Sequence, residues 1–186
     1  MGTRVIGLGH LGLYVQDIGR MTAFYSDFMG MTPTKVTDIS TFFSSDPERS
    51  DHEIALISGR PSAADPHLIN QISMRVATLD DLRDFYRRIK AEGLKIERLV
   101  THVSAIGCYF NDPEGNITEV FWVTGLPSWV NISIPIDIER PDAEIMADLQ
   151  RYWQTVRHVG VGEKPDAATA AAIRELVAGA QPATAR

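Results

Sequence analysis

The chain has 186 residues, of which 44% are hydrophobic and 23% are charged. This balance is typical of a globular protein with an apolar core and excludes a disordered or collagen-like chain. Eighteen lysines and arginines against 24 acidic residues give a formal charge of −6, which disfavours binding to nucleic acid or to an anionic membrane. The single cysteine excludes an internal disulfide, and no apolar run reaches the length of a signal peptide or a membrane span. We therefore expect a cytoplasmic protein.

One pattern occurs twice in the first two thirds of the chain. Residues 10–28 and residues 71–89 match at a constant offset of 61. In each copy an alternation of apolar residues gives way to apolar residues three or four apart, which predicts a strand that runs into an amphipathic helix. Further on, Asp46-Pro47 and Asp112-Pro113 each indicate a turn between two strands, because proline fixes its own φ and lacks the N–H that a strand ladder needs.

Each copy therefore predicts the order β-α-β-β-β, with residues 32–36 and 94–100 as the second strands. The expected fold is α+β, with two βαβββ modules, about 4–60 and 68–124, that form one cupped mixed sheet in a domain of residues 1–125.

Residues 126–186 are expected to form a C-terminal extension. A helix is predicted to start near Pro141, followed by an alanine-rich helix over about 167–179 and a frayed tail. The apolar face of the first helix favours contact with a second copy of the chain, so we expect a homodimer.

The duplication predicts a metal site. Equivalent positions of the two modules face one another across the cup, where polar side chains converge. The first strands place His10 and Gln71 there, and the last strands place Glu53 and Glu119 there. An imidazole, a carboxamide and one or two carboxylates suit Fe(II), Mn(II) or another divalent metal, and a buried Glu119 without a partner would be costly. We predict His10, Gln71 and Glu119 as ligands, with His67 as an alternative to Gln71.

Four stretches of the sequence point to a known family. They are Gly9–Val15, the helical Phe24-Tyr25 pair, Asp112–Asn116 and Thr118–Trp122. Together they resemble the vicinal oxygen chelate superfamily, which includes glyoxalase I, bleomycin resistance proteins and type I extradiol ring-cleavage dioxygenases. The resemblance covers about two thirds of the chain and implies the fold predicted above, but one such scaffold serves many reactions.

Resemblance to the dioxygenase branch implies roles for three further residues. By this resemblance His52 is an acid–base residue, and His102 and Tyr109 bind and polarise oxygen and substrate. The implied activity is metal-dependent, extradiol-type cleavage of a small catecholic aromatic substrate by O₂. Fe(II) is the expected cofactor, with Mn(II) or another divalent metal as the alternative.

One departure leaves other functions open. The dioxygenases resembled here usually carry histidine where this chain has Gln71, whose amide oxygen is a weaker donor. Some glyoxalase I-like isomerases and lyases instead use glutamine with a histidine and two glutamates, which here would be His10, Glu53, Gln71 and Glu119. A third possibility is a metal-free protein that binds a small aromatic molecule. Strand alternation separates the first two, because His52 and Glu53 cannot both point inward.

Overall fold

A computed structural model of the chain describes residues 3–62, 69–111 and 117–180. The helices are α1 (Ile18–Ala23), which continues into a π-helical turn (Phe24–Phe28), α2 (Leu79–Ala91), α3 (Asp142–Val156) and α4 (Ala167–Gly179). The strands are β1 (Gly7–Val15), β2 (Thr32–Val36), β3 (Ser40–Ser44), β4 (Ile54–Ser58), β5 (Ile69–Val76), β6 (Ile96–Thr101), β7 (Ala105–Asn111), β8 (Ile117–Val123) and β9 (Ile134–Pro135).

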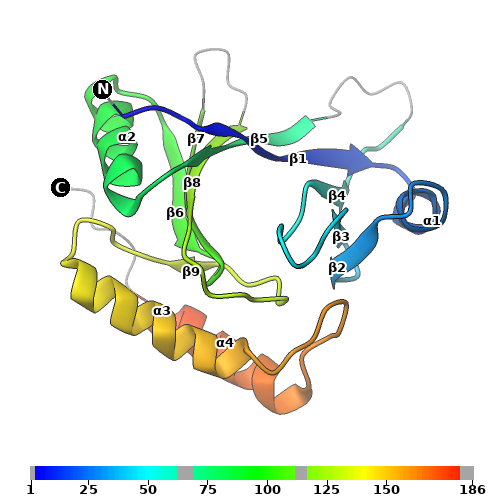
Figure 1. Ribbon diagram of the computed structural model, residues 1–186. Helices are drawn as coiled ribbons and strands as arrows, with labels where there is room; N and C mark the ends of the chain where they lie inside the picture. Colours follow the sequence, from blue (N-terminus) through cyan, green and yellow to red (C-terminus); the bar gives the residue numbers. More distant parts are fainter. Residues whose placement is uncertain (1–2, 63–68, 112–116, 181–186) are drawn as a thin grey trace.

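All these strands belong to one mixed sheet, in the order β2-β3-β4-β1-β5-β8-β7-β6-β9. The two modules meet at its centre, where β1 and β5 run antiparallel. In each module the first strand pairs in parallel with the last, β1 with β4 and β5 with β8. Figure 1 shows the sheet curled into a U, with α1 and α2 outside the curve. The predicted α+β fold of two βαβββ modules in one cupped sheet is confirmed.

Some boundaries of the elements differ from those predicted from the sequence. Strand β6 begins at Ile96, two residues later than expected, because the chain before it still completes the end of α2. There Gly93 has a φ of +69° and the N–H of Leu94 donates to the carbonyl of Ile89. A left-handed residue of this kind commonly ends a helix, and glycine adopts it without a steric cost. The second predicted turn, at Asp112-Pro113, lies outside the described residues.

The convex side of the sheet holds an apolar core. Helix α2 starts with a capping box between Thr78 and Asp81, which satisfies N–H groups at its first turn. Its buried residues, such as Leu82, pack against Cys108 of β7 and Val120 of β8. Because side chains alternate along a strand, the residues next to Cys108 and Val120 in the sequence point to the concave side.

The C-terminal extension packs on its own chain. Strand β9 pairs with β6 at one end of the sheet, and α3 buries Ile145 and Leu149 in the same core as α2. Figure 1 shows α3 and α4 across the open side of the U. The apolar face of α3, which prompted the expectation of a homodimer, is thus covered within the chain, and the homodimer stays a prediction. None of the helices in the three described segments is long and apolar enough to cross a membrane.

Candidate functional site

Five side chains, one from each of five neighbouring strands, form a row across the concave face of the sheet. The register places His10 of β1 opposite Ser73 of β5, and Ser73 opposite Glu119 of β8. Glu119 in turn lies opposite Tyr109 of β7, which lies opposite Arg98 of β6. Directly opposed residues on neighbouring strands point to the same face, so the five side chains form one continuous polar line.

Three predicted ligands come together at one end of this row. His10 Nε2 lies 2.9 Å from Gln71 Nε2 and 3.5 Å from Glu119 Oε2, and Gln71 Nε2 donates to Glu119 Oε2 at 3.3 Å. Ser73 Oγ lies 2.8 Å from His10 Nε2 and accepts from Gln71 Nε2 at 3.0 Å. The structure therefore brings His10, Gln71 and Glu119 together, with Ser73 among them as a fourth polar group.

The electrostatics of this cluster suit a cation. Glu119 is only 1% exposed, and burial raises the pKa of its carboxyl, although hydrogen bonds from Ser73 and Tyr109 and the charge of Arg98 oppose the rise. Burial lowers the pKa of His10 to about 2, so its imidazole is neutral at neutral pH and its contact with Glu119 is not an ion pair. A buried carboxylate without a full countercharge beside an imidazole nitrogen is a donor set that a divalent metal fits.

Gln71 is essential to that fit. Within the three described segments, no three His, Cys, Asp or Glu side chains gather closely enough to hold a metal ion. A metal site here would thus rest on His10, Glu119 and the carboxamide of Gln71, which must turn its Oε1 toward the ion. The alternative ligand His67 lies outside the described residues.

Two glycines make room for the cluster. A Cβ atom at Gly107 of β7 would lie 2.1 Å from Glu119 Oε1, so only glycine leaves space for this carboxylate. A Cβ at Gly9 would lie 2.2 Å from the ring of Phe121, whose centroid is 5.5 Å from that of His10. Both glycines therefore permit a close approach of side chain to backbone.

The next predicted residue, His52, lies against the cluster. Its ring centroid is 4.2 Å from that of His10, whereas the neighbouring Glu53 is turned away. The carboxylate of Glu53 accepts hydrogen bonds from the N–H and the hydroxyl of Ser45, both at 2.8 Å. Of the two adjacent residues, the structure thus brings His52 to the site and leaves Glu53 at the β3–β4 turn.

An ion pair behind His52, with its lysine buried, was not foreseen. Lys35 of β2 is 4% exposed and its Nζ lies 2.7 Å from Asp51 Oδ2. Burial raises the pKa of the Asp51 carboxyl, but Lys35 and His52 outweigh this and hold it well below its usual range. Asp51 Oδ1 lies 3.5 Å from His52 Nδ1, and in the described part of the chain neither atom has a well-formed hydrogen bond. Buried polar atoms usually have a partner, and a catalytic role or a bound water or ion is one explanation for those that lack one.

The remaining two predicted residues form a pair further along the row. His102 Nε2 lies 3.0 Å from the hydroxyl of Tyr109, and burial raises the pKa of that phenol well above its ordinary value, with the charge of Glu119 adding to the rise. The guanidinium of Arg98 lies over the ring, 3.9 Å from its centroid. Tyr109 thus connects His102 to the ligand cluster and stays protonated at neutral pH.

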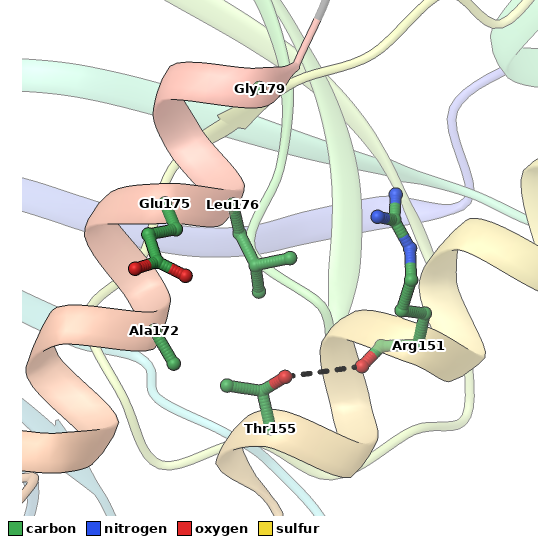
Figure 2. Close-up of a pocket in the computed structure, with 6 residues that line it drawn as sticks. All are labelled: Arg151, Thr155, Ala172, Glu175, Leu176 and Gly179. Atoms are coloured by element: carbon green, nitrogen blue, oxygen red, sulfur yellow. Dashed lines mark hydrogen bonds between the residues drawn. The ribbon is translucent and has the colours of Figure 1, made fainter.

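A separate hollow of about 390 Å³ lies between α3 and α4 (Figure 2). It is lined by Arg151, Thr155, Ala172, Glu175, Leu176 and Gly179. The one hydrogen bond drawn there, from the Thr155 hydroxyl to the Arg151 carbonyl, is internal to α3. No residue of the polar row lines this hollow, so it brings none of the predicted site residues together.

Sequence comparison finds similarity to biphenyl-2,3-diol 1,2-dioxygenases. It is 29% identical over 126 residues to the biphenyl-2,3-diol 1,2-dioxygenase of Paraburkholderia xenovorans (strain LB400), a match that covers 62% of this chain and 41% of the relative. It is 27% identical over 119 residues to biphenyl-2,3-diol 1,2-dioxygenase 3 of Rhodococcus globerulus, covering 61% of each. The chain thus spans less than two thirds of the length of these relatives.

Solved structures share the fold. The Mn(II)-bound glyoxalase from Novosphingobium aromaticivorans matches 64% of this chain and 39% of its own, at 24% identity and a TM-score of 0.55. Homoprotocatechuate 2,3-dioxygenase from Brevibacterium fuscum matches 66% and 38%, at 21% identity and a TM-score of 0.56. The sequence profile of the Glyoxalase/Bleomycin resistance protein/Dioxygenase superfamily matches residues 7–120, which is more than half of the chain. The chain therefore belongs to this superfamily.

Proposed function

We propose that this chain is a metal-dependent, extradiol-type ring-cleavage dioxygenase that acts on a small catecholic aromatic substrate and O₂. Similarity to two biphenyl-2,3-diol 1,2-dioxygenases supports the reaction class. The convergence of an imidazole, a carboxamide and a buried carboxylate supports a metal.

The proposed ligands are His10, Gln71 and Glu119, and Fe(II) is the proposed metal, with Mn(II) or another divalent ion as the alternative. When bound, the metal supplies Lewis-acid charge that favours the deprotonated form of a catechol, together with the capacity for oxygen chemistry. The neutral imidazole of His10 and the single charge of Glu119 leave net positive charge for an anionic substrate. The apolar ring of Phe121 beside His10 helps to exclude water from this side of the cluster.

The other predicted residues handle protons. His52 is proposed to accept the proton that a catechol hydroxyl must lose, since histidine is the side chain that exchanges protons near neutral pH. Tyr109 and His102 are proposed to place a hydrogen-bond donor where negative charge develops on oxygen or substrate. The high pKa of Tyr109 suits this role because the phenol keeps its proton.

One observation carries the choice of reaction: His52 packs against His10, while Glu53 is hydrogen-bonded to Ser45 away from the cluster. The isomerase alternative needs Glu53 as a fourth ligand, whereas the dioxygenase needs an acid–base residue at this place. Gln71 and the fold shared with a Mn(II)-bound glyoxalase favour the isomerase as the second candidate. The closed hydrogen-bond network of His10, Gln71 and Ser73 favours metal-free binding of an aromatic molecule as the third.

The test combines metal analysis with oxygen uptake. The full chain is purified without oxygen, its metal content is measured, and Fe(II) is added before biphenyl-2,3-diol and simpler catechols are supplied. We expect uptake of about one O₂ per catechol, with a coloured ring-opened product. Glu119→Gln should lose both metal and uptake, His52→Gln should keep the metal and lose uptake, and the control Glu53→Gln should keep both.

Other results would identify the alternatives. Bound metal without oxygen uptake, together with a loss of metal in Glu53→Gln, would replace the dioxygenase by the isomerase or lyase. A chain that takes up no metal but binds the catechols would exclude both enzymes and leave the binding protein.

A further inference from the structure

The turn between β6 and β7 has an unusual backbone. It consists of three residues, His102 to Ser104, and its central residue Val103 has a φ of +71°. In the part of the chain that the structure describes, it is the only non-glycine residue with a positive φ. A β-branched side chain strongly disfavours this region, so surrounding contacts must hold Val103 there.

The C-terminal extension supplies the packing contacts, and two threonines before it supply hydrogen bonds. The side chain of Val103 is 0% exposed and belongs to a cluster in which every other buried residue comes from the extension. These are Val130, Ile132, Ile134, Tyr152, Val156 and Val159. The carbonyl of Val103 accepts from the Thr124 hydroxyl at 2.6 Å, and its N–H donates to the Thr101 hydroxyl at 3.0 Å. The strained residue is thus fixed by packing and by both of its peptide groups.

The residue before Val103 is held by the same segment. His102 Nδ1 lies 2.6 Å from the backbone carbonyl of Ile132, and a carbonyl can only accept, so Nδ1 carries the proton. Burial lowers the pKa of His102 to about 4, which leaves the ring neutral and its Nε2 without a proton. Nε2 is then an acceptor 3.0 Å from the Tyr109 hydroxyl, whose one proton can be donated either to Nε2 or to Glu119.

The residue after Val103 reaches the other histidine of the site. The Ser104 hydroxyl donates to Asp51 Oδ2 at 3.0 Å, and the second oxygen of this carboxylate lies 3.5 Å from His52 Nδ1. One short turn therefore contacts the surroundings of both His52 and His102, and its central side chain is anchored in the extension.

We propose that the extension is a positioning element of the site: by burying Val103 and accepting from His102 Nδ1 through Ile132, it holds His102 as the Nδ1–H tautomer, whose Nε2 is a hydrogen-bond acceptor 3.0 Å from the Tyr109 hydroxyl. Val103 is then a positioning residue. The use of this arrangement in catalysis rests on the proposed function, while the tautomer itself does not.

The experiment reads the tautomer directly. Nitrogen-15 NMR of the imidazole groups is recorded on the full chain, and His102→Gln identifies the signals of His102. We expect one Nδ1–H tautomer with a slowly exchanging proton. Val103→Gly relieves the backbone and removes the anchor, so we expect a mixture with the Nε2–H form and proton exchange at least about tenfold faster.

Leu149→Ala is the matched control, because Leu149 is also 0% exposed and lies on α3, but belongs to the other core cluster, which does not contain Val103. It should lower thermal stability and leave the His102 signals unchanged. If Val103→Gly does not fold, Thr124→Val removes the hydroxyl that holds the Val103 carbonyl and should produce the same mixture.

An unchanged tautomer and exchange rate in the folded turn variants would overturn the proposal, as would equal loss of the tautomer in Leu149→Ala. If catechols are not cleaved, the proposed function fails, but the NMR result still decides this inference. If they are cleaved, Val103→Gly should lower kcat and leave KM nearly unchanged, whereas Leu149→Ala should change neither.

Discussion

Gly107→Ala tests whether the position of the Glu119 carboxylate governs metal binding. The new Cβ would lie 2.1 Å from Glu119 Oε1 and 3.1 Å from both Glu119 Cδ and the ring of Tyr109. Backbone atoms of a central strand move little, so the carboxylate oxygen must withdraw by about 1.3 Å before the contact becomes ordinary. A ligand displaced this far should weaken metal binding by about ten- to a hundredfold, which corresponds to about 1.4–2.7 kcal/mol. The crowding itself should cost about 1–3 kcal/mol of folding stability.

The assay is calorimetric titration of the metal-free chain with Mn(II), with urea unfolding of the same samples. Gly7→Ala is the control, because Gly7 lies on β1 and a Cβ there meets nothing within 4 Å. It should bind metal as the unmodified chain does. Equal affinities for Gly107→Ala and the unmodified chain would refute the reasoning, since Glu119 would then not be a ligand in the position described.

Two more predictions concern Gln71 and His102. Gln71→His replaces a weak amide donor by an imidazole, so anaerobic titration should show Fe(II) binding about tenfold tighter; unchanged or weaker binding would place residue 71 outside the metal's ligands. Burial lowers the pKa of His102 to about 4, so below pH 6.5 the unfolded chain takes up a proton that the folded chain does not. Stability should therefore fall by up to about 3 kcal/mol between pH 6.5 and pH 4, and urea unfolding should show a smaller fall in His102→Gln; equal falls would contradict the assignment.

Much of the fold could be predicted because the same pattern of strands and helix occurs twice in the sequence. Period-two and helical patterns are local properties, and their recurrence at an offset of 61 indicated the modules and the position of Glu119 on a last strand. The same offset equates His10 with Gln71, but the antiparallel register sets His10 opposite Ser73 and Gly12 opposite Gln71. This register is regular from His10 to Gly12 and shifts on either side of that stretch, and which residues stand opposite one another depends on tertiary packing rather than on local pattern. Ser73 was therefore missed as a member of the cluster.

Side chains that act across long sequence separations were also missed. Lys35 looks like an ordinary strand residue, and only the folded sheet buries it and brings it to Asp51. Likewise, nothing in the sequence around Val103 indicates a positive φ, because the cause is a cluster assembled from residues up to 56 positions later. Strand alternation indicates that only one of His52 and Glu53 can point inward, but not which one. The hydrogen bonds from Ser45 that hold Glu53 away from the cluster appear only in the folded chain.

The two outermost strands carry a further consequence. Strand β9 is two residues long and contains Pro135, while on β2 the carbonyl of Thr34 already accepts from the N–H of Gly162. Neither edge strand therefore exposes a long run of unpaired N–H and C=O groups. Such runs let the sheets of separate molecules pair and aggregate. The same residues that follow the duplicated modules thus protect an open, strongly bent sheet from uncontrolled polymerisation.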